Sequence, residues 1–200
     1  MKLLHIDSSA LGQYSVSREL SAALAAGWKR RNPDLEVVYR DLAAEPLAHW
    51  TPVADAADPA AVANQAVLDE FLSADVVVIG APMYNFGIPS SLKAWIDRVL
   101  VAGKTFKYGE KGPEGLAGGR KVIVASSRGG FYGDESGLAH MDFQEDYLRQ
   151  VFGFMGVTDL EFVRAEGIGL GPDHRAKALT SAHATIAERL PFEGAVFVDE

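Results

Sequence analysis

The sequence contains no cysteine, and this absence removes several classes of chemistry at once. Disulfide scaffolds, thiolate metal sites and cysteine nucleophiles all require that residue. Long apolar runs are missing as well: the longest, around Val76 to Ala81, is too short to span a bilayer. The amino-terminal run is interrupted by His5 and Asp7 and is too short for a signal-peptide core. We therefore expect a soluble protein of the reducing cytoplasm.

Positive charge is also scarce in this chain. It has 19 Lys and Arg residues against 27 Asp and Glu residues, for a formal net charge of -8. Nucleic-acid binding relies on clustered cations that release counterions from phosphates, so we expect no nucleic-acid partner. The loop after the first expected strand lacks both G-x-x-x-x-G-K-[ST] and G-x-G-x-x-G, which gives no support for a nucleoside triphosphate or a Rossmann-bound dinucleotide.

What the sequence does contain is an alternation of short apolar runs and amphipathic segments. The expected strands are 2–7, 35–41, 76–81, 121–126 and 158–165. The first helix is expected around 20–28, and the others at 61–72, 90–101, 143–155 and 173–190. Segment 43–59 is expected to be an irregular connection, and 104–116 a hairpin or excursion.

This alternation, with its short connections, predicts an α/β three-layer sandwich of the flavodoxin-like type. Its parallel sheet would have five strands in the order 2-1-3-4-5, with helices on both faces. We expect a single domain over 1–190 and a carboxyl-terminal tail over 191–200, in which Val196 to Val198 could add an edge strand. Ligands of such sheets lie outside the carboxyl ends of the strands where the order reverses. Loops 8–17, 82–89 and 126–137 are therefore expected to meet there.

The first of these loops carries Ser9, Ser15 and Ser17 and leads into a helix. Free backbone N–H groups and the helix dipole at a helix amino terminus favour an anion such as phosphate, without any cationic side chain. The alternative is that Ser15 is simply a helix cap and the other serines are ordinary loop residues.

The second loop places Met83, Tyr84, Asn85 and Phe86 directly after the central strand. Such a loop suits a flat heteroaromatic ring: Met83 and Phe86 would pack on or beside it, and backbone amides around Asn85 and Phe86 would bond its edge. The alternative is that Met83 and Phe86 belong to the core and Tyr84 to the surface.

The third loop contains Ser127, Arg128, Gly129 and Gly130. Glycines permit close approach of the backbone to a planar ligand. Arg128 has two interpretations, because its charge could stabilise a reduced, anionic ring or pair with a nearby carboxylate.

Together these segments resemble the FMN-dependent NADH azoreductases, also described as quinone reductases. The resemblance spans nearly the whole chain, and its most specific part is the segment from Pro82 to Phe86 followed by a helix. Further parts of it are 14–17, 40–43, 112–116, 127–130 and 165–167.

The resemblance implies a set of site residues. The FMN phosphate would be held by Ser9, Ser15, Val16 and Ser17. The ribityl chain and the isoalloxazine ring would be held by Met83, Tyr84, Asn85, Phe86, Ser127, Arg128, Gly129 and Gly130. The resemblance also implies a homodimer with two flavin sites at the subunit interface, where Tyr108 and Phe152 help to shape the substrate pocket. Segment 131–140 differs from familiar members and lies beside the expected site, which adds Phe131 to the pocket.

The implied reaction is a two-electron transfer in a ping-pong scheme. NADH or NADPH passes a hydride to flavin N5, the nicotinamide product leaves, and a quinone or azo compound takes the electrons in the vacated pocket. The flavin performs the difficult step, while the protein supplies stacking, orientation and electrostatics. No catalytic triad and no metal are therefore required.

Two other classes of protein are alternatives to a flavin-dependent reductase. A Ser-His-Asp hydrolase is suggested by Asp7, Ser8 and Ser9 at the end of the first strand, and it would need His174 or His183 bonded to Ser8 or Ser9. An electron-transfer flavodoxin would share the fold and the FMN, but it would turn over NADH slowly.

Overall fold

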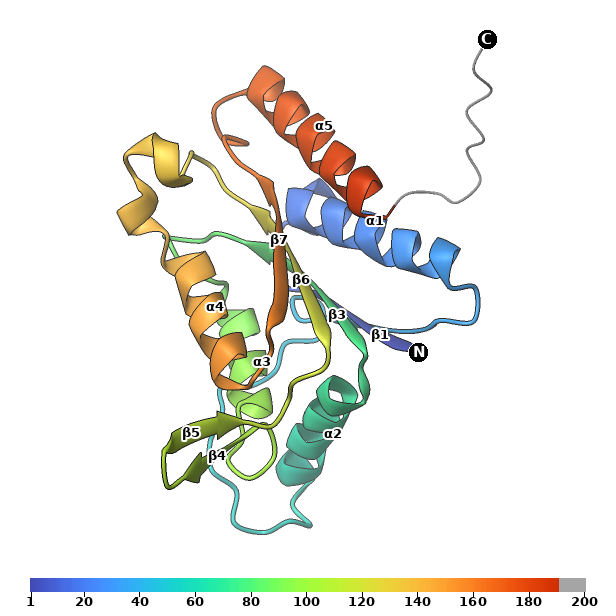
Figure 1. Cartoon of the computed structure of the whole chain (residues 1–200), viewed down its shortest axis with the longest axis vertical. Coiled ribbons are helices and arrows are strands. Elements are labelled where there is room, and N and C mark those ends of the chain that lie inside the picture. Colours follow the sequence, from blue (N-terminus) through green and yellow to red (C-terminus); the bar gives the residue numbers. More distant parts are fainter. Residues whose placement is uncertain (191–200) are drawn as a thin grey trace.

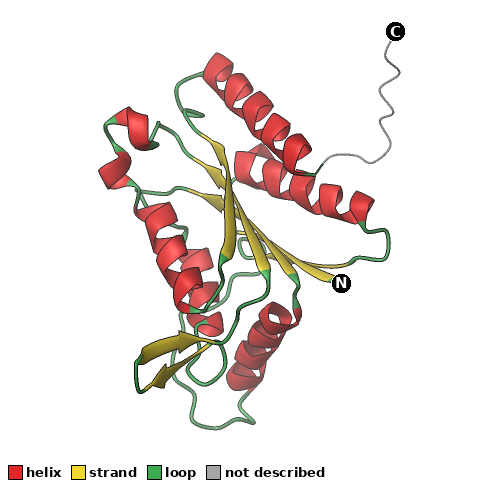
Figure 2. Cartoon of the chain, in the orientation of Figure 1, coloured by secondary structure: helices red, strands yellow, loops and turns green. Residues whose placement is uncertain are grey.

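A computed structural model describes residues 1–190 and shows a five-stranded parallel sheet at the centre of the protein (Figure 1, Figure 2). The strands are β1 (Lys2–Asp7), β2 (Glu36–Asp41), β3 (Val76–Pro82), β6 (Lys121–Ser127) and β7 (Asp159–Ala165). Their order is β2-β1-β3-β6-β7, which is the expected order 2-1-3-4-5 when β4 and β5, which lie outside this sheet, are not counted. The expected tail, with its candidate edge strand, lies outside the described residues.

Helices cover both faces of the sheet (Figure 1). One face carries α1 (Val16–Arg31) and α5 (Pro172–Arg189). The other carries α2 (Pro59–Ser73), α3 (Ser90–Val99) and α4 (Phe143–Phe154). Short 3-10 turns lie at Gly12–Tyr14, Asp134–Ser136 and Ala139–Met141. Among the helices of residues 1–190, none combines the length and the apolar character needed to cross a membrane.

Strands β1, β3, β6 and β7 contribute side chains to two hydrophobic cores, because successive side chains of a strand point to opposite faces. In β3, Val77 and Ile79 pack in the core under α2, α3 and α4, whereas Val76 and Val78 pack in the core under α1 and α5. All of β3 is buried, which explains why its sequence shows an unbroken β-branched run rather than an alternation.

The segment expected to be a hairpin or excursion is a hairpin. It consists of the antiparallel strands β4 (Phe106–Gly109) and β5 (Gly112–Gly115). Ala117, two residues after β5, donates its backbone N–H to the carbonyl oxygen of Met155 at 2.8 Å. Met155 lies between the end of α4 and the start of β7. The hairpin therefore lies at the amino edge of the sheet, away from the carboxyl edge where the three loops leave the strands (Figure 1).

Helix caps shape the carboxyl edge. Ser15 caps α1 by accepting a hydrogen bond from the Arg18 N–H at 3.3 Å. At the start of α3, Pro89 occupies the cap position, without a side-chain bond. Ser91 Oγ instead donates to the Ser8 carbonyl at 3.3 Å, so it ties the start of α3 to the first loop.

Candidate functional site

The three predicted loops meet at the carboxyl edge of the sheet, because β1, β3 and β6 are neighbouring parallel strands. Loop 8–17 contacts loop 82–89 through the Ser9 Oγ and Tyr84 hydroxyl oxygens, 3.2 Å apart. Loop 82–89 contacts the end of β6 through the Met83 N–H, which donates to the Ser127 carbonyl at 2.8 Å. The rings of Phe86 and Tyr132 lie edge to face, with their centroids 6.2 Å apart. The loops therefore form one continuous surface.

In the first loop, the side chains of Ser9, Ser15 and Ser17 are buried, and those of Ser15 and Ser17 are bonded to each other. Ser9 and Ser17 are fully buried, and Ser15 Oγ lies 3.1 Å from Ser17 Oγ while it caps α1. The cap interpretation is thus right for the Ser15 side chain. The backbone N–H groups of Val16 and Ser17 have no hydrogen-bond partner among residues 1–190. These two N–H groups are therefore available to an anion. Ser15 and Ser17 share one hydrogen bond, so one of their two hydroxyl groups also keeps a hydrogen to donate.

The second loop is a tight two-residue turn with an unusual backbone. Tyr84 and Gly87 exchange two backbone hydrogen bonds of 3.0 Å, and the residues between them have positive φ: 48° at Asn85 and 72° at Phe86. This is the type I′ geometry, and a bulky residue such as Phe seldom adopts it without strain. Strained backbone of this kind clusters at ligand sites.

That turn leaves groups available to a ligand. The N–H groups of Asn85 and Phe86 have no partner in the described part of the chain, and Phe86 is 41% exposed. The Tyr84 hydroxyl also accepts from the Ala10 N–H at 3.2 Å, so it links two loops rather than facing solvent alone. Met83 is half-buried. The core interpretation of Phe86 is therefore wrong, because its ring stands at the surface.

In the third loop, the Arg128 side chain is only 1% exposed. Its guanidinium pairs with Asp142 at 2.8 Å, with Glu166 at 3.3 Å and with Glu145. Glu166 also accepts from the Tyr132 N–H at 2.8 Å. Of the two interpretations of Arg128, the structure supports the pairing with carboxylates. The guanidinium is buried and enclosed by carboxylates, and the implied role of Arg128 in holding the flavin stays a prediction.

The first of the two glycines that follow has open space above its backbone. The carbonyl oxygens of Gly129 and Gly130 accept from the Gly169 and Gly167 N–H groups at 3.0 and 2.9 Å. A Cβ atom placed on Gly129 would meet nothing within 4 Å. Close packing within the chain therefore does not explain this glycine, and free space above the backbone suits a ligand that lies against it.

The structure does not bring all three predicted pocket residues to this edge. Phe131 follows the third loop and is 47% exposed, which places it beside the site. Tyr108 is 76% exposed but sits on β4, at the opposite edge of the sheet (Figure 1). Phe152 is fully buried in the core between α4 and the sheet. Its ring has no free surface in the single chain, and its implied role in the substrate pocket stays a prediction.

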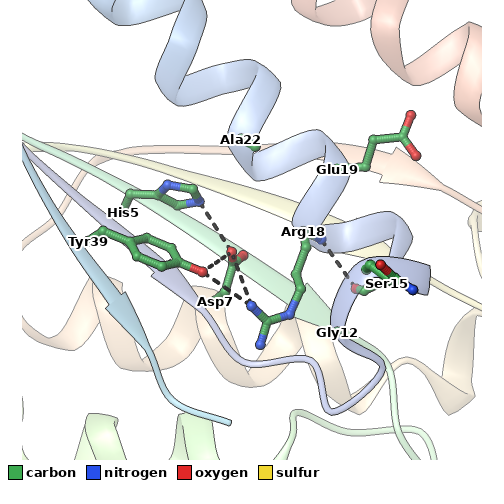
Figure 3. Close-up of a pocket in the computed structure, with 9 residues that line it drawn as sticks. His5, Asp7, Gly12, Ser15, Arg18, Glu19, Ala22 and Tyr39 are labelled. Carbon is green, nitrogen blue, oxygen red and sulfur yellow. Dashed lines mark hydrogen bonds and ion pairs between the residues drawn. The ribbon is translucent and has the colours of Figure 1, made fainter. Parts of the chain in front are cut away.

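Sequence reasoning did not identify a polar cluster that lies beside the first loop (Figure 3). Asp7 accepts from Ser21 Oγ at 2.7 Å and from the Tyr39 hydroxyl at 3.0 Å, and His5 Nε2 lies 3.0 Å from Ser21 Oγ. We call it the Arg18 cluster, and its members are His5, Asp7, Arg18, Ser21, Tyr39 and Asp41.

The sequence did contain a signal for this cluster. His5 and Asp7 are alternate residues of β1 and therefore share a face of the sheet. In the parallel register they stand beside Tyr39 and Asp41 of β2. Four polar residues at matching positions of two neighbouring strands indicate a polar patch rather than a hydrophobic core.

Electrostatics within the cluster shift the pKa of three groups. Burial, together with Asp7, raises the pKa of Tyr39 to about 12. The hydrogen bonds from Arg18 lower the pKa of Asp41 to about 2. The same hydrogen bonds raise the pKa of Arg18. Asp41 is therefore ionised and Tyr39 neutral across the whole physiological range.

The Asp41 shift predicts an acid response of stability. A carboxylate whose pKa is lower in the folded than in the unfolded protein stabilises the fold above its unfolded pKa, about 4, and loses this effect as the pH falls toward 2. Urea denaturation should show the Asp41 contribution, roughly 2 kcal/mol, disappearing over that interval. In Asp41→Asn that part of the loss should be missing. The control is Asp97→Asn, which breaks an exposed pair with Lys93. This variant should still show the loss of stability that Asp41 causes between about pH 4 and about pH 2.

The contacts required for a Ser-His-Asp hydrolase are not formed. Ser8 Oγ donates to the Gly80 carbonyl at 2.7 Å, and Ser9 Oγ contacts Tyr84. His183 Nε2 lies 3.0 Å from a Glu19 carboxylate oxygen, and within residues 1–190 neither His174 nor His183 contacts Ser8 or Ser9. The hydrolase interpretation therefore has no geometric support.

Comparisons with known proteins agree on one family. A family model described as "Flavodoxin-like fold" matches residues 1–190. The chain is 59% identical over 197 residues to "FMN-dependent NADH:quinone oxidoreductase 1" of Xanthomonas axonopodis pv. citri (strain 306), an alignment that covers 98% of this chain and 100% of that protein. It is also 59% identical over 192 residues to "FMN-dependent NADH:quinone oxidoreductase 2" of Bradyrhizobium diazoefficiens, covering 91% of this chain and 95% of that one.

A solved structure is similar as well. The azoreductase from Bacillus anthracis str. Sterne superposes with a TM-score of 0.86 at 31% sequence identity, over 95% of this chain and 98% of that chain. The sequence similarity and the shared architecture extend over nearly all of the described residues. The chain therefore belongs to the family of FMN-dependent NADH:quinone oxidoreductases, within the flavodoxin-like fold.

Proposed function

We propose that this protein is an FMN-dependent NADH:quinone oxidoreductase that also reduces azo compounds. The observation that carries the proposal is the pairing of two sets of free backbone N–H groups on one sheet edge. Val16 and Ser17 offer theirs at the start of α1, and Asn85 and Phe86 offer theirs in the strained turn after β3. One set suits a phosphate and the other suits the polar edge of a ring.

The residues of this edge fit FMN in its three chemical parts. The phosphate would bind at the N–H groups of the α1 start, within the loop that carries Ser9, Ser15 and Ser17. The ribityl chain and the ring would lie between segment 83–86 and segment 127–130, with Phe86 beside the ring and the open backbone of Gly129 against it. From Arg128, the fit uses its backbone position rather than its buried charge.

Bound FMN would supply the redox chemistry, in which NADH, a proton and a quinone give NAD⁺ and a hydroquinone. The part of the protein is to bind, orient and exclude water. The exposed rings of Phe86 and Phe131 offer apolar surface on which a nicotinamide or a quinone can stack. The names of the relatives specify NADH, which favours NADH over NADPH as the donor.

A homodimer forms part of the proposal. Tyr108 stands on the hairpin at the opposite edge of the sheet, so within one chain it cannot reach the three loops (Figure 1). Only a second copy could bring this exposed aromatic ring to a substrate pocket. The absence of cysteine supports a location in the reducing cytoplasm.

Steady-state kinetics test the proposed function and its order of events. With FMN-loaded protein, NADH and benzoquinone should be turned over rapidly, and double-reciprocal plots at several fixed quinone concentrations should be parallel. Intersecting lines would contradict the ping-pong order, because they require both substrates to be bound together. Very slow NADH oxidation by a protein that holds FMN would instead favour an electron-transfer flavodoxin.

A further inference from the structure

Arg18 is the residue that joins the Arg18 cluster to the loop that carries the serines (Figure 3). Its Nε and Nη2 donate to the Ser9 carbonyl at 3.1 and 2.8 Å. Its Nη1 and Nη2 donate to the two carboxylate oxygens of Asp41, each at 2.6 Å. One guanidinium therefore binds a loop carbonyl and a strand carboxylate at once, with the planar fork geometry that only arginine offers.

The direction of the Ser9 carbonyl matters for anion binding. A phosphate is held by N–H groups, and a carbonyl oxygen turned toward it would repel it. Arg18 holds this carbonyl on its own side of the loop. The Ser9 side chain is held separately, because its Oγ contacts the Tyr84 hydroxyl at 3.2 Å and accepts from the Leu11 N–H at 3.3 Å.

Direct attraction between Arg18 and a phosphate does not explain this arrangement. The Arg18 side chain is 16% exposed, and it faces Asp41 and also Asp7, whose carboxylate oxygen lies 3.7 Å from Nη1. Two carboxylates against one guanidinium leave this group with no surplus positive charge. A cation in the first turn of a helix also opposes the helix dipole unless an acid pairs with it.

We propose that Arg18, anchored by Asp41, is a positioning residue for the FMN phosphate: it fixes the Ser9 carbonyl away from the anion site and so sets the affinity of loop 8–17 for phosphate. The proposal rests on FMN being the cofactor. It assigns Arg18 no contact with FMN and no part in the chemistry. Its effect should therefore appear in phosphate binding and not in ring binding.

The test compares two ligands that differ only in the phosphate. Apo-protein is titrated with FMN and with riboflavin, and flavin fluorescence gives each dissociation constant. Arg18→Lys keeps the charge but cannot hold both partners in the same geometry, so the dissociation constant for FMN should rise about tenfold, as the loss of a charged hydrogen bond would produce. The dissociation constant for riboflavin should change by less than about twofold.

Arg40→Lys is the matched control. Arg40 lies one residue before Asp41 and forms the same kind of forked pair, with Glu70 at 2.9 and 2.7 Å, but it does not touch loop 8–17. It should leave the ratio of the two dissociation constants unchanged. Equal changes for FMN and riboflavin in Arg18→Lys, or no change at all, would overturn the proposal.

Asp41→Asn provides a second, independent variant. It keeps Arg18 but removes the charged anchor, and it should weaken FMN more than riboflavin. Tighter FMN binding in this variant would overturn the proposal, because it would mean that a released Arg18 binds the phosphate directly. If the unaltered protein bound neither ligand, the proposed function itself would fail. That result differs from an Arg18→Lys variant whose two dissociation constants are unchanged.

Discussion

Arg128→Met is expected to lower the free energy of unfolding by about 3–5 kcal/mol, the cost of removing one partner from a buried ionic network. The guanidinium is 1% exposed and is shared by Asp142, Glu145 and Glu166. Arg164 would still neutralise Glu145, with which it forms two bonds of 2.6 Å. Asp142 and Glu166 would be left without this partner. Urea denaturation measures the loss.

Arg149→Met is the control for this prediction. Arg149 pairs with Glu145 at 3.2 Å, but its side chain is 49% exposed. Because the arginine is half exposed and Glu145 keeps its bonds with Arg128 and Arg164, this variant should lose less than about 1 kcal/mol. If Arg128→Met were as stable as the unaltered protein and lost only flavin binding, the guanidinium would be a ligand of the cofactor, and our account of the third loop would be wrong.

Gly80→Ala should also be damaging, by about 1–3 kcal/mol from overpacking alone. The new Cβ would collide with the Asp7 carboxylate and would lie 3.0 Å from Ser21 Oγ and 3.1 Å from the Ser17 carbonyl oxygen. Asp7 cannot simply turn aside, because it accepts bonds from Ser21 and Tyr39. The start of α1 would have to move off the sheet, so FMN affinity should fall together with stability.

The same methyl group should have the opposite effect at Gly153. This residue is exposed in α4, and an added Cβ would meet nothing within 4 Å. Replacing a helical glycine with alanine typically stabilises by about 0.5–1 kcal/mol. Thermal or urea unfolding of the two variants therefore gives a paired test. A stable Gly80→Ala protein with normal FMN affinity would show that the contact between β3 and the Arg18 cluster is looser than the structure indicates.

The parts of the fold that follow from local pattern were predictable. The apolar run of β3 and the alternating segments around it give the sheet and its order, because short connections allow few topologies. The meeting of the three loops follows from that order. The free amides of Asn85 and Phe86 were also expected, but their positive φ was not, since neither residue is a glycine.

Other features depended on contacts that a single segment does not reveal. The partners of Arg128 are the cap residue of α4, a residue in its first turn and the residue after β7, so its pairing with carboxylates could not be predicted from its own loop. Phe152 has helical periodicity whether it faces the core or a pocket, and only the packing of α4 decides between them. The role of Arg18 was not predictable for the same reason, because its partner Asp41 lies in the neighbouring strand β2.

The most direct test of the account is the visible absorption spectrum of the purified protein as two substrates are added in turn. We expect a yellow protein, as isolated or after adding FMN, whose flavin absorption bleaches when NADH is added without oxygen and returns when a quinone follows. A colourless protein that cannot take up FMN would contradict the central claim that this sheet edge holds a flavin.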